Sequence, residues 1–218
     1  KKKFNKFLYF PKKNFYLIHK KSLINFKKYL KIYKSFGLKF NIEKVKKYSK
    51  YVDYSQISGC LNTEEGVILI DKLIPYLRKK LEKKTKIFKG LKIDRIDNST
   101  GVIYSKKKKL QQYDLIINTT YENPNLGLSK NKFKLKYELT GMVKILKPFK
   151  EQIGLTIMDG SYCSLYPQNK KEATISSVKY TPIFKSTSFK KINNKLKNLN
   201  KKNIKKNIIN HASQFINF

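Results

Sequence analysis

Three small polar residues, Asn118, Thr119 and Thr120, directly follow the apolar run Leu115–Ile117. A short apolar run bounded by turn-forming residues is typical of a strand buried on both faces, as in a parallel sheet. In open α/β sheets, ligands bind outside the carboxyl ends of the strands. The sequence therefore predicts a ligand-contacting loop at these three residues, although a core strand that simply ends in a loop gives the same pattern.

The histidines and cysteines form no recognisable reactive group. His19 and His211 have no acidic or cysteine neighbour in the sequence, which favours structural roles. Cys60 and Cys163 lie too far apart for metal-ligand spacing, and we expect both to be reduced thiols in a cytoplasmic protein.

The acidic residues and glycines also lack a catalytic pattern. Glu64 and Glu65 are adjacent, so on a strand they would point to opposite faces and make a poor acid–base pair. A position on the surface of a turn is the expected role of both. The nine glycines form neither a GxGxxG turn nor a phosphate-binding loop. Residue chemistry alone therefore names no reaction.

The charge of the chain is strongly positive. Its 218 residues contain 50 basic and 14 acidic side chains, a formal net charge of +36, which favours a polyanionic partner. Arg78 and Arg95 are the only arginines, however, whereas phosphate and base recognition favours the guanidinium group. Lys, Asn, Ile, Phe and Tyr share A/T-rich codons, so codon drift explains much of the lysine but not the scarcity of acids. Some general affinity for polyanions is therefore expected.

The remaining composition indicates a folded chain of one large domain or two small ones. It is 40% hydrophobic and 13% aromatic, values typical of a globular protein. It contains no run of 18 apolar residues, so no membrane-spanning helix is predicted. The basic N-terminal stretch lacks the apolar core of a signal peptide.

The first half of the chain mixes predicted strands and helices. A helix capped by Ser22 and ended by Gly37 carries apolar residues at helical spacing. Asp71 can cap a second helix that tolerates Pro75 in its first turn. Strands are predicted at Phe15–His19, within Val45–Ile57, at Thr85–Phe88 and Leu91–Ile96, and in a hairpin of Val102–Tyr104 and Lys106–Lys109.

The second half has the alternating pattern of an antiparallel sheet. Lys134–Leu146 and Ala173–Tyr180 alternate polar and apolar residues. Gly154–Asp159 and Ser161–Tyr166 meet across an Asp-Gly pair, which is a strong hairpin signal. Phe189–Phe218 predicts a helical tail whose apolar phase slips at residues 200–203, so two helices are possible.

Five of these segments, in order, resemble the middle of a flavin-dependent oxidoreductase of the D-amino-acid-oxidase and glycine-oxidase type. EGVILIDKLIPYLRKKL is similar to a helix of that family, KIFKGLKIDRI to a strand beside the adenosine end of FAD, and YDLIINTT to the segment that closes the dinucleotide fold. YELTGMVKILKP and GLTIMDGSYCSLYP resemble the substrate-domain sheet. The family usually has small Ala and Gly residues where this chain has Thr120 and Tyr121, which are bulkier.

The resemblance implies an α/β (α+β mixed) fold, with a partial Rossmann-like FAD-binding layer and an antiparallel-sheet substrate domain. Residues 1–66 would supply substrate-domain strands and a helix, and residues 67–124 a partial FAD-binding segment. Residues 125–188 would form the antiparallel substrate-domain sheet, followed by a helical tail at 189–218.

The resemblance also implies the cofactor contacts. Ile93 would lie near adenine, and Asn118, Thr119 and Thr120 would lie near the ribityl–pyrophosphate path of FAD. No metal is implied.

Three further residues are candidates for the substrate face: Tyr137, Asp159 and Tyr162. Asp159 is equally explained as a hairpin-turn residue, and the two tyrosines by packing in a core.

The implied activity is hydride transfer to flavin from a C–N or C–O bond of a small amino- or sugar-type substrate. The family's GxGxxG unit would precede Lys1 and its last strand would follow Phe218, so we expect a fragment that binds FAD poorly and is inactive alone. This hypothesis requires Leu115–Ile117 in a parallel layer and a separate antiparallel sheet after Lys134. If either fails, a non-enzymatic, lysine-rich polyanion-binding protein takes its place; a scaffold domain that has lost catalysis is a third possibility.

Overall fold

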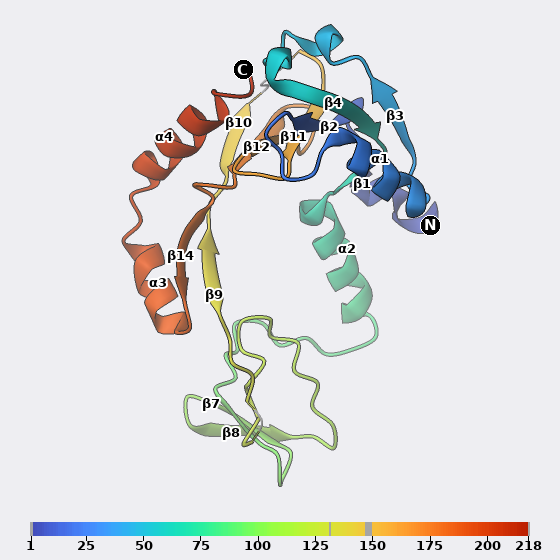
Figure 1. Ribbon diagram of the computed structural model, residues 1–218. Coiled ribbons are helices and arrows are strands. Elements are labelled where there is room, and N and C mark those ends of the chain that lie inside the picture. The colour runs from blue at the N-terminus through green and yellow to red at the C-terminus, as the bar shows by residue number, and fades with distance from the viewer. Residues whose placement is uncertain (1, 131, 147–149, 218) are drawn as a thin grey trace.

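The computed structural model describes residues 2–130, 132–146 and 150–217, so Lys1, Pro148 and Phe218, named above as segment ends, lie outside it. The fold is a mixture of α-helices with antiparallel and mixed β-sheets, which confirms the α+β class (Figure 1). Its largest element is a seven-stranded sheet in the order β10-β13-β12-β11-β2-β4-β3. The strands are β2 (Lys13–His19), β3 (Phe40–Glu43), β4 (Ile57–Thr63), β10 (Val143–Leu146), β11 (Ile153–Met158), β12 (Cys163–Pro167) and β13 (Glu172–Ser177).

The sheet combines strands from the first 63 residues with strands from residues 143–177. β2 pairs with β11 in parallel, with Asn14 opposite Gly154 and Tyr16 opposite Thr156, and the other neighbours are antiparallel. Among the described residues, the strands after residue 134 pair with one another only in antiparallel directions, as the sequence predicted, but they are not a separate sheet, because β11 also pairs with β2. The long connection between β2 and β11 leaves either strand direction possible, so local patterns could not decide it.

The two faces of the sheet differ in polarity. On one face, alternate residues of neighbouring strands are apolar and completely buried, among them Phe15, Leu155, Leu165 and Ile175. Helix α4 (Lys201–Ala212) packs against this face through Ile208 and Ala212, which belong to the same core cluster. Burying a leucine side chain contributes roughly 1.5–3 kcal/mol, so this face provides most of the stability of the fold.

Helix α1 (Phe26–Ser35) covers part of the opposite face. Its Phe26 ring occupies the space where a Cβ on Gly59 would stand, so β4 needs glycine there. The cap is Asn25, whose side chain accepts a hydrogen bond from the Lys28 amide at 2.9 Å. The predicted cap, Ser22, is wrong: its hydroxyl instead donates to the Met158 carbonyl at 2.8 Å.

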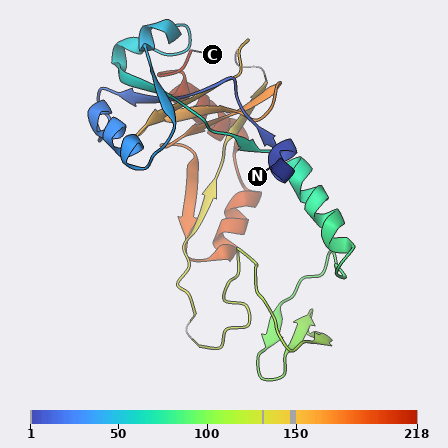
Figure 2. The ribbon, with the colours of Figure 1, turned by 90° about the vertical axis from the view of Figure 1, so that its right-hand side faces the viewer.

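A lobe of residues 70–136 extends away from the sheet (Figures 1 and 2). It contains α2 (Ile70–Glu82) and a three-stranded antiparallel sheet of β6 (Arg95–Asp97), β7 (Val102–Ser105) and β8 (Lys108–Gln112). A short pair, β1 (Leu8–Tyr9) with β5 (Val67–Ile68), precedes α2. On the return path, β9 (Tyr137–Thr140) pairs with β14 (Pro182–Ser186), against which α3 (Phe189–Lys197) packs.

The structure corrects the predicted buried strand at residues 115–117. This segment has no assigned secondary structure, and Leu115 and Ile117 are 76% and 75% exposed. The described part of the lobe offers it no backbone partner, and an extended segment without partners gains no ladder hydrogen bonds. Residues 67–124, where described, also contain no parallel strand pair.

Other local predictions of strands and helix caps are also wrong. Residues 45–56 form the 3₁₀ turns η2 (Val45–Tyr48) and η3 (Tyr54–Gln56) rather than strands, and residues 85–88 are irregular. A further 3₁₀ turn, η1 (Lys2–Phe7), begins the chain. α2 begins at Ile70 with Leu69 as its N-cap, so Asp71 lies within its first turn and Pro75 within its body. The C-terminal tail does split into two helices, with Asn200 capping α4.

Candidate functional site

The four residues that the resemblance assigns to the cofactor line one pocket. Ile93 comes from the segment before β6, whereas Asn118, Thr119 and Thr120 follow the unpaired residues 115–117. The pocket has a volume of about 350 Å³. Apolar and aromatic side chains complete its wall: Ile96, Ile103, Tyr113, Leu115, Ile116, Ile117 and Leu126.

Asn118 fixes the shape of the polar rim of this pocket. Its side-chain NH₂ donates to the backbone carbonyls of Asn123 at 3.0 Å and Leu126 at 3.1 Å. Its carbonyl oxygen accepts from the Thr120 amide at 2.9 Å and from the Thr120 hydroxyl at 2.6 Å. An apolar wall with a rim of amide and hydroxyl groups suits a flat aromatic ring that carries a polar chain.

The three substrate candidates are not brought together. Tyr137, on β9, donates its hydroxyl to the Glu122 carbonyl at 3.1 Å. Asp159 occupies the β11–β12 turn with a φ of 63°, and its backbone and side chain accept from the amides of Leu23 and Ile24. Tyr162 is 8% exposed and packs 4.8 Å from the His19 ring. In this structure each has a turn or packing role.

The histidines and cysteines are buried among structural partners. His19 Nε2 lies 3.0 Å from the Gln56 side-chain oxygen, and His211 Nδ1 lies 3.0 Å from the Ser177 hydroxyl. Burial raises the pKa of both thiols, Cys60 and Cys163, to about 12, so neither is a thiolate at neutral pH. The described residues contain no cluster of His, Cys, Asp or Glu that could hold a metal ion.

A second site, which sequence reasoning did not find, lies on the polar face of the large sheet. Asn14 on β2 is 2% exposed. Its side-chain NH₂ donates to the Thr63 hydroxyl at 2.9 Å and to Glu65 Oε2 at 3.0 Å. The Tyr16 hydroxyl donates to the same carboxylate oxygen. Both glutamates follow the end of β4 and are exposed, in agreement with the predicted surface position, and Glu64 pairs with Lys39.

Three tyrosine hydroxyls near Glu65 are held in the protonated form. Burial, and then the negative charge of Glu65, raise the pKa of Tyr33 and of Tyr166 to about 12. Burial and the hydrogen bond to Glu65 raise the pKa of Tyr16 further. All three are therefore neutral hydroxyl groups at physiological pH.

Two polar atoms of this second site lack hydrogen bonds. Asn14 Oδ1 and the Tyr166 hydroxyl are buried and without a partner in the described part of the chain. A Cβ on Gly154 would overlap Asn14 Oδ1 and would lie 3.4 Å from the Tyr166 ring. An unsatisfied buried polar group costs about 1–3 kcal/mol, so these two atoms lower the stability of this part of the sheet.

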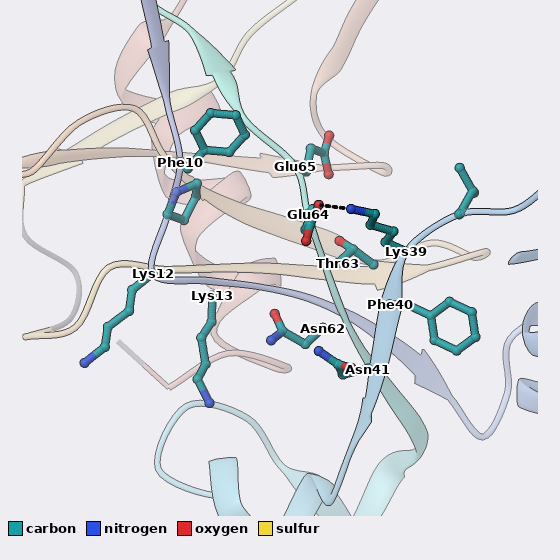
Figure 3. A pocket seen from close by; sticks show the side chains of 12 residues that line it. Phe10, Lys12, Lys13, Lys39, Phe40, Asn41, Asn62, Thr63, Glu64 and Glu65 are labelled. Carbon is teal, nitrogen blue, oxygen red and sulfur yellow. Dashed lines mark ion pairs between the residues drawn. The ribbon is translucent and has the colours of Figure 1, made fainter. Parts of the chain in front are cut away.

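A pocket of about 710 Å³ opens beside Glu65 and Thr63 (Figure 3). Its lysines are directed to other groups. Lys13 Nζ lies 2.9 Å from the Tyr48 hydroxyl and 3.8 Å from Glu43, and Lys39 Nζ lies 4.0 Å from Glu64. In Figure 3 the side chains of Lys12 and Lys13 extend away from Glu65.

Comparisons of the chain with protein-family models, with curated proteins and with solved structures find no match. Within the described residues, no helix has both the length and the apolar character needed to cross a membrane.

Proposed function

We propose that this chain is a non-enzymatic, lysine-rich polyanion-binding protein, because Leu115–Ile117 does not lie in the parallel layer that the flavin-dependent alternative requires. The second candidate is a fragment of an FAD-dependent oxidoreductase that oxidises a C–N or C–O bond of a small amino- or sugar-type substrate. The observation that favours this second candidate is the common pocket of Ile93, Asn118, Thr119 and Thr120. Asn118, Thr119 and Thr120 are consecutive in the sequence, so the informative part of this observation is that Ile93, from a separate segment, lines the same pocket.

A parallel strand at residues 115–117 does not support the flavin-dependent candidate, because that strand is not formed. This candidate therefore requires that the lobe form the Rossmann-like layer only when another surface covers its exposed apolar side chains. Ile70, Leu81, Phe88, Leu115 and Ile117 are all more than 40% exposed, and such a density of exposed apolar side chains marks a surface built for contact.

The residues of the pocket fit one end of the cofactor. Apolar walls suit adenine, and the Asn118–Thr120 rim suits hydroxyl groups of the ribose or ribityl chain. None of the residues that line the pocket belongs to a helix, so no helix N-terminus is directed at the pyrophosphate. When bound, the flavin would accept the hydride; the chain's residues would hold and orient the adenosine side.

Titration of the chain with AMP, FAD and inorganic pyrophosphate at constant ionic strength tests the second candidate. We expect weak, saturable binding of AMP and FAD that exceeds the binding of pyrophosphate. Ile93→Asp should abolish the difference, because it places a carboxylate in the adenine wall. Leu91→Asp is the matched control, since Leu91 is an exposed apolar residue of the same segment that does not line the pocket. Equal affinity for AMP and pyrophosphate would reject the second candidate.

The proposed function, sequence-independent polyanion binding, is supported by the net charge of +36 and by the absence of the strand predicted at residues 115–117. Fourteen acids cannot neutralise 50 bases, so most lysines are available to anions. This function predicts that binding to single-stranded DNA ignores sequence and weakens steeply with salt, with a slope of about −0.7 per phosphate contacted. Binding that is insensitive to salt would reject it.

A further inference from the structure

The pocket of about 710 Å³ shown in Figure 3 combines an exposed aromatic ring with lysine side chains. Phe10 and Lys12 come from the segment between β1 and β2, whereas Lys39 and Phe40 come from the beginning of β3 and the residue before it. Phe10 is 59% exposed. An aromatic ring that stays exposed beside lysines is typical of proteins that bind single-stranded nucleic acids.

The backbone of Gly66 supports the Phe10 ring from one side. A Cβ on Gly66 would stand 2.7 Å from the nearest atom of that ring, so only glycine lets the ring lie this close. Much of the ring nevertheless stays exposed to solvent. Because the ring is both supported and accessible, a planar base can stack on it.

Lys12, two residues after Phe10, is placed to contact a phosphate. It is exposed, and in Figure 3 its side chain extends away from Glu65. Three lysines and two glutamates line the pocket, so its net charge is positive. The glutamates already have partners, because Glu64 lies 4.0 Å from Lys39 and Glu65 accepts hydrogen bonds from neutral side chains. The positive charge of Lys12 therefore remains directed at solvent beside the exposed ring.

Two carboxamides add neutral hydrogen-bonding groups to the same pocket. Asn41 on β3 and Asn62 on β4 are opposite each other in the strand register, so their side chains lie on one face of the sheet, and both line the pocket. A carboxamide carries donors and an acceptor, so it can bond to a sugar or to the edge of any base. Such groups add contacts without selecting one base.

We infer that this pocket binds single-stranded nucleic acid, with one base stacked on Phe10 and the adjoining phosphate beside Lys12. The inference rests on the proposed polyanion binding, and it names both the class of polyanion and the place where it binds. A polyanion without rings gains nothing from Phe10, whereas every nucleobase has an aromatic face. Stacking therefore selects nucleic acid among polyanions and still tolerates every sequence.

Fluorescence anisotropy titrations of the chain with a short oligothymidylate, and with an abasic strand that has the same number of phosphates, test the inference. We expect the oligothymidylate to bind at least about fivefold more tightly, because only its bases can stack. Phe10→Leu keeps an apolar side chain against Gly66 but removes the flat ring, so it should lower the affinity for oligothymidylate to that for the abasic strand. Phe133→Leu is the matched control and should leave both affinities unchanged, since Phe133 is 61% exposed and does not line the pocket.

Lys12→Gln tests the phosphate contact separately. It should weaken the binding of both strands and reduce the slope of log affinity against log salt by about 0.7, the value for one phosphate contact on a single strand. Lys20→Gln is its control, because Lys20 is an exposed lysine that follows the opposite end of β2 and does not line the pocket. It should leave the slope unchanged.

The outcomes separate this inference from the proposed function. Equal affinity for the two strands, with no effect of Phe10→Leu, would overturn the inference and leave general polyanion binding in place. Equal losses in Phe10→Leu and Phe133→Leu would also overturn it, because stacking would then not be localised to the pocket. Failure of the chain to bind either strand would overturn both the inference and the proposed function.

Discussion

The seven-stranded sheet and the lobe of residues 70–136 use similar apolar residues in opposite ways. In the sheet, Leu155 and Leu165 are completely buried between neighbouring strands and α4. In the described part of the lobe, only Val102 and Ser105 are buried, and α2 buries no residue. The difference teaches that an apolar pattern stabilises a structure only where the rest of the chain supplies a second layer.

The largest expected effect compares a leucine from each region. Leu165→Ala should lower the free energy of unfolding by about 2–5 kcal/mol, because it leaves a cavity in a close-packed core. Leu115→Ala should change it by less than about 0.5 kcal/mol, since Leu115 is 76% exposed. Urea unfolding followed by circular dichroism measures both. Similar losses in the two variants would mean that the lobe is packed against a partner layer in solution.

Glycine substitutions sharpen the same comparison at a smaller scale. Gly154→Ala should cost about 1–3 kcal/mol, because its Cβ would overlap Asn14 Oδ1 and force that side chain away from Glu65. Gly90 in the lobe has no neighbour within 4 Å of a Cβ, so Gly90→Ala should cost only the strain of its φ of 69°, about 1 kcal/mol. Thermal unfolding measures both changes. A larger cost at Gly90 would contradict the assignment of tight packing to the sheet.

Limited proteolysis should distinguish the local stabilities of the two regions without any substitution. Lysines are plentiful in both, so trypsin specificity does not bias the comparison. The first cuts should fall within residues 83–136, where few side chains are buried and little backbone is paired. Addition of a ligand that covers the lobe, such as FAD at saturating concentration, should slow these cuts. Initial cleavage within β11 to β13 would show that the sheet is the less stable region.

The smallest expected effect is a pH dependence that belongs to the sheet region alone, since both histidines lie there. Burial, and then the charge of Lys179, lower the pKa of His211. The unfolded chain therefore binds the proton first, and stability present above the ordinary histidine pKa of about 6.5 declines as pH falls through the lower folded value. Unfolding at pH 7 and pH 5 should show a smaller difference in His211→Gln than in the parent chain. An unchanged difference would assign the pH dependence to other groups.

Part of the fold followed from local patterns. Period-two alternation predicted β10 and β13 of the sheet, and the Asp159-Gly160 pair predicted the β11–β12 hairpin, whose turn residue Asp159 has a φ of 63°. The grouping of Ile93 with Asn118, Thr119 and Thr120 was also anticipated, but only through a family resemblance. Such features depend on residues close in sequence or on a pattern already known.

The Glu65 site could not be predicted, because its residues come from separate strands. Asn14 lies on β2, Gly154 on β11 and Tyr166 on β12, and only the strand order makes them neighbours. In the sequence, Asn14 and Tyr16 form an ordinary strand pattern. Only the tertiary structure shows that both contact the carboxylate of Glu65.

The sequence by itself determined the basic charge, the mixed α+β character and the alternating strands of the sheet, because these depend on composition and short-range periodicity. Only the tertiary structure decided that β2 runs parallel to β11, that residues 115–117 remain unpaired, and that Glu65 faces tyrosines rather than lysines. The physical reason is that strand pairing and burial are set by contacts between distant segments, whose free energies no local pattern encodes.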